Sequence, residues 1–168
     1  MCGKYRSIEH EDMSPTQPIT VICLYQNQMV YQKKIWGYTV SIHSSRIINA
    51  RCETLFSKKI FQEDIQQRRC VIPAQGFYQK DSTNHSVQFV DQQDQVLFMA
   101  GIYHDNEVTI ITTKANEVMK PIHDRMPLFI PKHYILQWLQ DTDFAKEILK
   151  KDLSDLKIVS GHIQQSLF

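Results

Sequence analysis

The chain has 168 residues, of which 42% are apolar and 22% charged, with 5 glycines and 6 prolines. This composition excludes a collagenous or largely disordered chain, and the length predicts one compact domain over residues 1–168. The net charge of +1 gives no general sign of nucleic-acid binding, although a local cluster of Lys and Arg could still bind phosphate.

The first half of the chain predicts a β-hairpin, a helix and a further strand. β-Branched and aromatic residues at 19–25 predict a buried strand, a polar turn follows at 26–28, and 29–40 predicts the partner strand. Apolar side chains at helical spacing predict a helix over 53–68. A strand that runs to residue 80 follows this helix.

The second half begins with three predicted strands. Residues 86–91, 95–103 and 107–116 are rich in β-formers, and polar turns separate them. Strands joined by short turns are typical of a β-meander, so we expect consecutive pairing. The fold class is therefore α+β with a mainly antiparallel sheet.

Helices are predicted near the end of the chain. A short helix at 116–122 would stop at Pro121, and Pro131 lies where the first turn of a helix over 131–140 tolerates proline. Asp141 precedes another helical pattern with lysines toward its end, the arrangement that the helix dipole favours.

No apolar run approaches the roughly 20 residues that cross a bilayer, and the N-terminus does not resemble a signal peptide. We therefore expect an intracellular, cytoplasmic protein with no membrane partner. The four cysteines, Cys2, Cys23, Cys52 and Cys70, contain no C-x-x-C pair, which argues against zinc and a disulfide framework. All but Cys2 are predicted to be small buried apolar residues.

Four segments carry candidate chemistry: MCGKY at 1–5, NARCET at 49–54, RRCVIPAQGFYQK at 68–80 and IHDRMPLFI at 122–130. Their order and spacing resemble the SOS-response-associated peptidase (SRAP) family. Its members begin Met-Cys-Gly-Arg-Tyr and continue with Asn-Ala-Arg-x-Glu-Thr, Arg-Cys-x-x-Pro-x-x-Gly-Phe-Tyr-Glu-Trp and His-x-Arg-Met-Pro. Four further segments agree with the family: WGY at 36–38, FMAGIY at 98–103, TIITTKAN at 109–116 and VSGHIQQ at 159–165.

The resemblance implies a compact α+β fold with a β-barrel-like core and flanking helices. It also implies a protein that links its N-terminal cysteine covalently to abasic sites in single-stranded DNA. The peptidase in the family name reflects removal of the residues before that cysteine, and it implies autoproteolytic and lyase-like activity. We expect a monomer, bacterial or phage-encoded and nucleoid-associated, with no cofactor and no metal.

The chemistry of Cys2 can be argued from the residue itself. Met1 is normally trimmed before a side chain as small as Cys, which would leave Cys2 with a free α-amine beside its thiol. The open aldehyde of an abasic sugar condenses with an amine to an imine, and the neighbouring thiol then closes a five-membered thiazolidine. Reference pKa values of about 7.7–8.0 for the amine and about 8.5 for the thiol leave both groups reactive near neutral pH.

The resemblance assigns roles to four further residues. Asn49 would orient the Cys2 amine, and His123 would move protons to or from the sugar oxygen. Arg51 and Arg125 would hold the phosphates that flank the lesion. Without the family, Asn49 is more simply a turn or cap residue, His123 a hydrogen-bonded or solvated side chain, and the arginines are surface ion-pair partners.

The most consequential departure from the family pattern is Gln79, which stands where the family has an acid/base glutamate. Gln79 forms hydrogen bonds but cannot exchange a proton in the working pH range, so we expect slow crosslinking. Asp81 could compensate if the strand continues, although Asp81 more simply opens a turn. Glu53 is a second nearby carboxylate, with a structural role in the family.

Three further positions are candidate DNA contacts. Lys80 replaces the family tryptophan, which exchanges a stacking platform for phosphate attraction. Lys4 replaces the usual arginine and keeps the charge without the bidentate fork. Trp36 is a candidate stacking or wedge residue, with a core position as the alternative.

Two other functions stay open at the level of sequence. Cys2 could be the nucleophile of an N-terminal-nucleophile peptidase or amidohydrolase, with His123 as its base. Alternatively, the change to Gln79 could mark a module that binds single-stranded DNA without the covalent step.

Overall fold

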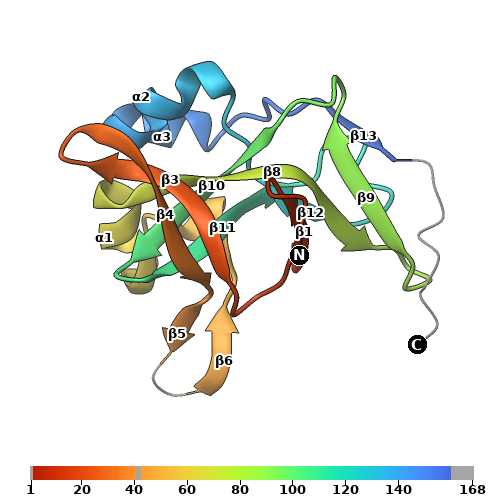
Figure 1. Cartoon of the computed structure of the whole chain (residues 1–168), viewed down its shortest axis with the longest axis horizontal. Coiled ribbons are helices and arrows are strands. Elements are labelled where there is room, and N and C mark those ends of the chain that lie inside the picture. Colours follow the sequence, from red (N-terminus) through yellow and green to blue (C-terminus); the bar gives the residue numbers. More distant parts are fainter. Residues whose placement is uncertain (1, 41–42, 160–168) are drawn as a thin grey trace.

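The computed structural model describes residues 2–40 and 43–159, so nearly all of the predicted VSGHIQQ motif lies outside the described residues. Strands dominate this part of the chain (Figure 1). The strands are β1 (Tyr5–Ser7), β2 (Asp12–Met13), β3 (Pro18–Tyr25), β4 (Gln28–Trp36), β5 (Tyr38–Val40), β6 (His43–Ile47), β7 (Asn49–Arg51), β8 (Arg69–Lys80), β9 (Ser86–Asp91), β10 (Leu97–His104), β11 (Glu107–Lys114), β12 (Arg125–Pro127) and β13 (Leu156–Ile158). The helices are η1 (Cys52–Thr54), α1 (Lys59–Gln67), η2 (Lys132–Tyr134), α2 (Ile135–Gln140) and α3 (Thr142–Ile148), where η marks a 3-10 helix.

The central sheet closes on itself, because β8 pairs with both β3 and β10 in the order β10-β11-β4-β3-β8. The ring is uneven: β3 and β4 pair along eight residues, whereas β3 meets β8 only at Ile22 and Val71. The β4–β11 contact is parallel and short. The α+β prediction is therefore confirmed, and the core is an irregular ring in place of a regular barrel.

The hairpin predicted in the first half is confirmed. β3 and β4 pair in antiparallel register across a turn at Gln26 and Asn27, both of which have positive φ, the conformation that favours tight hairpin turns. The second strand ends at Trp36, earlier than predicted, because Gly37 adopts a φ of 117° and turns the chain into β5. The β5–β6 hairpin projects from the lower edge of the molecule in Figure 1.

The predicted β-meander is wrong in its first step. β9 does not pair with β10, because the long strand β8 pairs with β10 through its first half and with β9 through its second half. β10 and β11 do form the expected antiparallel pair. β8 also pairs with β1 at Tyr5 and Phe77, which brings the start of the chain to the end of β8.

The helices differ from their predicted bounds in two places. The helix predicted over 53–68 begins only at Lys59, because Cys52–Thr54 forms a 3-10 turn and the backbone of Lys58 is extended. The segment 116–122 forms turns, with Asn116 Oδ1 accepting from the Met119 amide at 3.0 Å, and not a helix. No helix in the described part of the chain is long and apolar enough to cross a membrane.

The last two helices follow the sequence signals. Pro131 lies immediately before η2, which continues into α2, and the carboxylate of Asp141 accepts from the amides of Asp143 and Phe144 at the start of α3. Helices α1, α2 and α3 lie toward one end of the molecule, on the left in Figure 1, and strands β9 and β13 of the central sheet lie toward the other end. Trp138 of α2 and Ile65 of α1 are buried in the core cluster under the helices.

Candidate functional site

Cys2 lies just before β1 and is buried, with only 1% of its surface exposed. Its Sγ lies 3.8 Å from the carbonyl oxygen of Lys4 and donates a weak hydrogen bond to it. Burial raises the pKa of the Cys2 thiol to about 12, because the thiolate loses its solvation. The thiol is therefore protonated near neutral pH, in contrast to the reactive population expected from its reference value.

Asn49 contacts the backbone of Cys2. Its Nδ2 donates a 2.9 Å hydrogen bond to the Cys2 carbonyl oxygen, across 47 positions of sequence. The parallel pairing of β7 with β11, with Asn49 opposite Ile110, holds this side chain in place. The Oδ1 atom of Asn49 is buried and has no hydrogen-bond partner among residues 2–40 and 43–159.

Gln79 reaches the same end of the sheet from β8. The register that places Tyr5 opposite Phe77 continues in a 3.0 Å hydrogen bond from the Tyr78 amide to the Lys4 carbonyl, which brings Gln79 alongside Gly3. The Gln79 side chain is 9% exposed, and its buried Oε1 also lacks a partner in the described part of the chain. Gly3 and Gln79 line a cavity of about 400 Å³, together with Lys4, Ser14, Tyr78, Lys80 and Ser86.

Asp81 lies beyond the end of β8 in a turn. Its Oδ1 accepts hydrogen bonds from the Thr83 amide at 2.9 Å, from the Thr83 hydroxyl at 2.6 Å and from the His85 amide at 2.9 Å. These bonds, the largest of them with Thr83, lower the pKa of Asp81. The carboxylate therefore caps the turn, as the simpler interpretation of the sequence expected, and is not directed along the strand beside Gln79.

His123 precedes β12 and is partly buried. Burial lowers the pKa of His123, and the positive charge of the N-terminal amine acts in the same direction. The ring is therefore neutral at pH 7, and its Nδ1 accepts a 3.0 Å hydrogen bond from the Arg125 amide. Asp124 Oδ1 also lies 3.0 Å from Nδ1, but this carboxylate is exposed and forms an ion pair only when the ring is protonated.

Arg125 is buried, with 6% exposure, and is paired within the protein. Nη1 and Nη2 donate to the two carboxylate oxygens of Glu53 at 2.7 and 2.9 Å, and Nη2 also donates to the Thr112 carbonyl at 2.9 Å. The hydrogen bonds from Arg125 lower the pKa of Glu53 to about 2. This arrangement makes Arg125 a structural partner of Glu53, and the predicted phosphate contact stays a prediction.

The other predicted cations are exposed. Arg51 lies at the end of β7 on the same face as Asn49, because side chains two apart on a strand point the same way. Lys80 is exposed at the end of β8. Lys4 is exposed too, with its Nζ 3.2 Å from Asp12 and 5.2 Å from the centre of the Tyr78 ring.

Trp36 lies in the core, which corrects its placement among the DNA-binding residues. Its side chain is 0% exposed, and its Nε1 donates to the Ile48 carbonyl at 3.0 Å. The indole packs edge-on against Tyr5 with ring centres 5.6 Å apart. A completely buried indole cannot stack on a nucleobase, so the alternative of a core residue holds.

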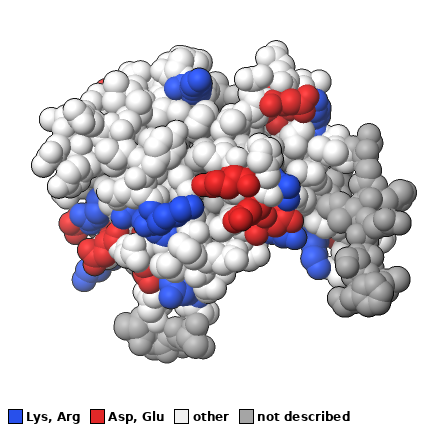
Figure 2. Space-filling view, in the orientation of Figure 1, with Lys and Arg blue, Asp and Glu red and all other residues white. Residues whose placement is uncertain are grey.

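Sequence reasoning missed Asp12, which organises the outer face of β1. Its carboxylate lies 3.2 Å from Lys4 Nζ and 3.2 Å from Arg6 Nη1, and it accepts from the Tyr78 hydroxyl at 3.0 Å. No spacing rule links Asp12 to these partners, because the antiparallel pairing of β2 with β1 brings them together. Acidic and basic side chains are interspersed on the face drawn in Figure 2, which therefore has no large patch of a single sign.

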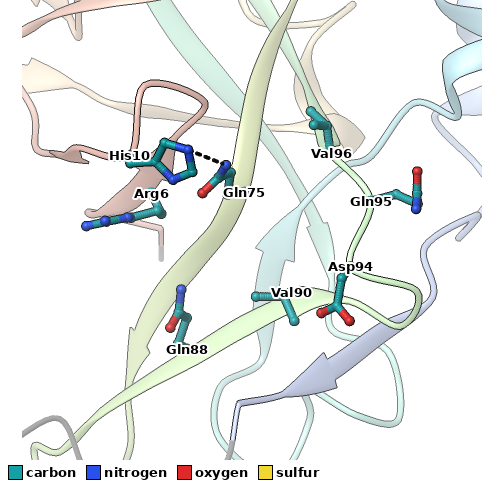
Figure 3. A pocket seen from close by; sticks show the side chains of 8 residues that line it. All are labelled: Arg6, His10, Gln75, Gln88, Val90, Asp94, Gln95 and Val96. Atoms are coloured by element: carbon teal, nitrogen blue, oxygen red, sulfur yellow. Dashed lines mark hydrogen bonds between the residues drawn. The ribbon is translucent and has the colours of Figure 1, made fainter.

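A separate cavity of about 350 Å³ opens toward the other end of β1 (Figure 3). Neutral amides contribute much of its lining, and Gln75 points toward His10, with 3.5 Å between the two Nε2 atoms. Arg6 lies at the edge of this cavity, and the Gln95 side chain points away from Gln75 and Gln88 (Figure 3). No residue with a role predicted from the motifs lines this cavity, so it is distinct from the site around Cys2.

A family model and two curated proteins match this chain in sequence. The family model described as SOS response associated peptidase (SRAP) matches residues 1–164. The abasic site processing protein YoqW of Bacillus subtilis is 32% identical over 130 residues, 67% of this chain and 58% of that protein. The abasic site processing protein YoaM of the same organism is 34% identical over 118 residues, 62% of this chain and 52% of that protein. The chain thus spans little more than half the length of these curated relatives.

Solved structures agree on the fold. A Bordetella bronchiseptica protein superposes with a TM-score of 0.78 at 18% identity, covering 95% of this chain and 100% of that one. A phage-related protein from the same organism gives a TM-score of 0.76 at 21% identity, covering 90% of this chain and 82% of that one. At these identities the similarity concerns the fold alone.

Proposed function

Because the chain belongs to the SOS response associated peptidase (SRAP) family, we propose that it processes abasic sites in DNA by forming a thiazolidine crosslink through Cys2. Its curated relatives are named abasic site processing proteins, which supports this substrate class. The observation that carries the proposal is the hydrogen bond from Asn49 to the backbone of Cys2, which fixes the N-terminal residue beside a polar side chain.

Two buried oxygen atoms near Cys2 lack hydrogen-bond donors. Asn49 Oδ1 and Gln79 Oε1 are buried without partners among the described residues, and each such atom costs about 1–3 kcal/mol when it stays unpaired. Removal of Met1 would create an α-amine on Cys2, whose N–H groups are donors of the type these oxygens lack. We infer that Asn49 positions this amine and that Gln79 offers it a second acceptor.

The proposed reaction begins at the amine. The nitrogen of Cys2 attacks the aldehyde carbon of the opened abasic sugar, and water leaves to give the imine. The thiol then adds across the C=N bond, so that an S–C bond forms and the thiol proton ends on nitrogen. Because burial raises the pKa of the Cys2 thiol, the proton has to be carried from sulfur to nitrogen, and we propose His123 as the relay, which takes up the proton on Nδ1 when the hydrogen bond from the Arg125 amide opens.

Electrostatic binding would bring single-stranded DNA to the site. Arg51 and Lys80 are exposed and Lys4 is held by Asp12, so Arg51 and Lys80 are the cations most accessible to phosphate. Neither has a carboxylate within ion-pair distance among the described residues. We propose that they flank the lesion, and that the protein acts on the strand as a monomer.

A crosslinking assay tests the proposal. The mature chain, with Met1 removal checked by mass, is incubated with a single-stranded oligonucleotide that contains one abasic site and is run on a denaturing gel. A shifted band is expected from wild type and from Cys23→Ala, whose thiol is buried on β3, and no band from Cys2→Ser. A band that persists in Cys2→Ser, or none in wild type, contradicts the crosslink.

The same assay separates the alternatives. Specific binding without any adduct would assign a non-covalent DNA-binding module, which the glutamine at position 79 favours because it cannot exchange a proton. Cys2-dependent cleavage of peptides without DNA would assign an N-terminal-nucleophile hydrolase.

A further inference from the structure

A third cavity lies between η1, the end of β11 and α3. Its volume is about 650 Å³, within the range of ligand-binding cavities. Its floor is mainly apolar and its rim carries three lysines. The residues that line it are Cys52, Glu53, Phe56, Thr113, Lys114, Lys146, Leu149 and Lys150.

The three rim lysines are exposed and available to an anion. Lys146 lies 3.9 Å from Asp143 and Lys150 lies 3.4 Å from Glu147, both across solvent-exposed pairs of the kind that contribute little energy. Lys114 has no carboxylate within ion-pair distance in the part of the chain that the structure describes. An incoming phosphate can therefore replace these contacts at little cost.

The floor of the cavity presents an aromatic ring. Phe56 is half-buried, and the Lys146 ammonium lies 5.4 Å from the centre of its ring. A partly exposed ring with a flexible cation above it can also serve as a stacking platform for a nucleobase, since the exposed lysine can move to a phosphate. Leu149 and Cys52 extend the apolar surface around the ring.

The cavity lies beside the ion pair of Glu53 and Arg125 and the end of β11. Glu53 both lines the cavity and holds Arg125, and Lys114 is paired in register with Arg125 across β11 and β12. Arg51 immediately precedes Cys52 of the lining. Arg51 adds an exposed cation next to this lining, and we take DNA, the substrate of the proposed function, over an acidic peptide as the occupant of this cationic region.

We propose that this cavity binds the single-stranded DNA that flanks the abasic nucleotide, with one unpaired base against Phe56 and backbone phosphates at Lys114, Lys146 and Lys150. The inference rests on the proposed function, and it specifies where the DNA strand on one side of the abasic nucleotide is bound. Single-strand binding proteins combine these two elements, a cationic groove and an aromatic platform. The contact is not specific for sequence, because every base has a face that can stack.

Binding measurements on the non-reactive Cys2→Ser chain test the cavity. Fluorescent single-stranded DNA with one stable abasic analogue is titrated at several salt concentrations against Lys146→Ala/Lys150→Ala and Phe56→Leu. The matched control is Lys33→Ala/Lys157→Ala, which removes two exposed, ion-paired lysines elsewhere. We expect the cavity lysine variant to bind about tenfold more weakly and to lower the salt slope by about 0.7 per lost contact. Phe56→Leu should weaken binding about fivefold or more.

Strand truncation gives the second readout. Oligonucleotides are shortened on either side of the abasic analogue, and the effect of the cavity variants should disappear when one side, and only that side, is removed. Variants that behave as the control at every length would overturn the cavity proposal, while crosslinking through Cys2 in the wild type would leave the proposed function intact. Loss of affinity for a poly-glutamate peptide with unchanged DNA binding would instead assign the cavity to an acidic protein partner.

Discussion

Arg125 and Glu53 form a bidentate ion pair that joins β12 to the 3-10 turn after β7. The same guanidinium donates to the Thr112 carbonyl of β11, so three segments meet at one side chain. The turn that carries Glu53 begins directly after Arg51, and β7 begins with Asn49. The ion pair therefore fixes the strand from which Asn49 reaches Cys2.

Replacing Glu53 with glutamine should destabilise the protein by about 1–3 kcal/mol near neutral pH, because the buried guanidinium loses its anionic partner and Glu53 is partly screened by solvent. The pKa of Glu53 falls from an ordinary 4.5 to about 2 in the folded state, so its stabilisation is present above pH 4.5 and is lost as the pH falls toward 2. Urea unfolding across this range should show the wild-type and Glu53→Gln stabilities converging in acid.

The matched control is Glu147→Gln, which removes an exposed carboxylate paired with Lys150 and should change stability by less than about 1 kcal/mol. A Glu53→Gln difference that stays constant from neutral pH to about pH 2 would contradict the ion-pair explanation.

Asn49→Ala should slow crosslinking at saturating DNA by about 10²-fold, because the N-terminal residue loses the hydrogen bond that fixes it. Asn49 is a positioning residue, so affinity for the non-reactive abasic analogue should be unchanged. Asn49→Asp keeps an oxygen for the Cys2 amine while losing the donor to the Cys2 carbonyl, and should fall between wild type and Asn49→Ala. Equal rates for all three chains in rapid-quench experiments would remove Asn49 from the site.

Gln79→Glu should accelerate crosslinking by up to about 10²–10⁴-fold, because a carboxylate restores proton exchange at this position. Burial of the position should raise the pKa of the new carboxyl above its usual value of about 4.3, so the gain should grow as the pH rises through that raised pKa. Gln75→Glu, on the same strand but in the separate cavity of Figure 3, is the control and should leave the rate unchanged. An identical gain from both variants would indicate a general charge effect.

Trp36→Phe should lower stability by about 1–3 kcal/mol, because the Ile48 carbonyl loses its indole donor inside the core. DNA binding and the crosslinking rate should be unchanged at temperatures where the variant is folded, as checked by thermal melting. Weaker DNA binding with unchanged stability would contradict the core role of Trp36 and support a direct contact with DNA.

Local signals in the sequence predicted the elements that local chemistry controls. The β3–β4 turn depends on Gln26 and Asn27, and the start of α3 depends on the cap at Asp141, and both are readable from a few neighbouring residues. The pairing of β9 is different, because the choice between β8 and β10 is made by distant segments of a long strand. The late start of α1 is set at Lys58, whose extended backbone (φ −80°, ψ 121°) separates the 3-10 turn from the helix despite the helical spacing of the apolar residues.

The motifs predicted the identity of the candidate site residues, whereas the surroundings of these residues are known only from the structure. The hydrogen bond between Asn49 and Cys2 agrees with the proximity that the family pattern implied. The surroundings of Trp36 and Arg125 could not be predicted, because both residue types occur on DNA-binding surfaces and also in cores when a carbonyl or carboxylate is at hand. The burial of a Trp or Arg side chain, and not the residue type, distinguishes a core residue from a DNA-binding residue.

The enclosure of Cys2 also bears on chemical selectivity inside a living cell. An exposed thiolate is open to oxidation by peroxides. A thiol that is 1% exposed and stays protonated is protected from reagents that attack sulfur. Closure of a thiazolidine requires sulfur in its reduced form, so this enclosure preserves the group on which the second step of the proposed crosslink depends.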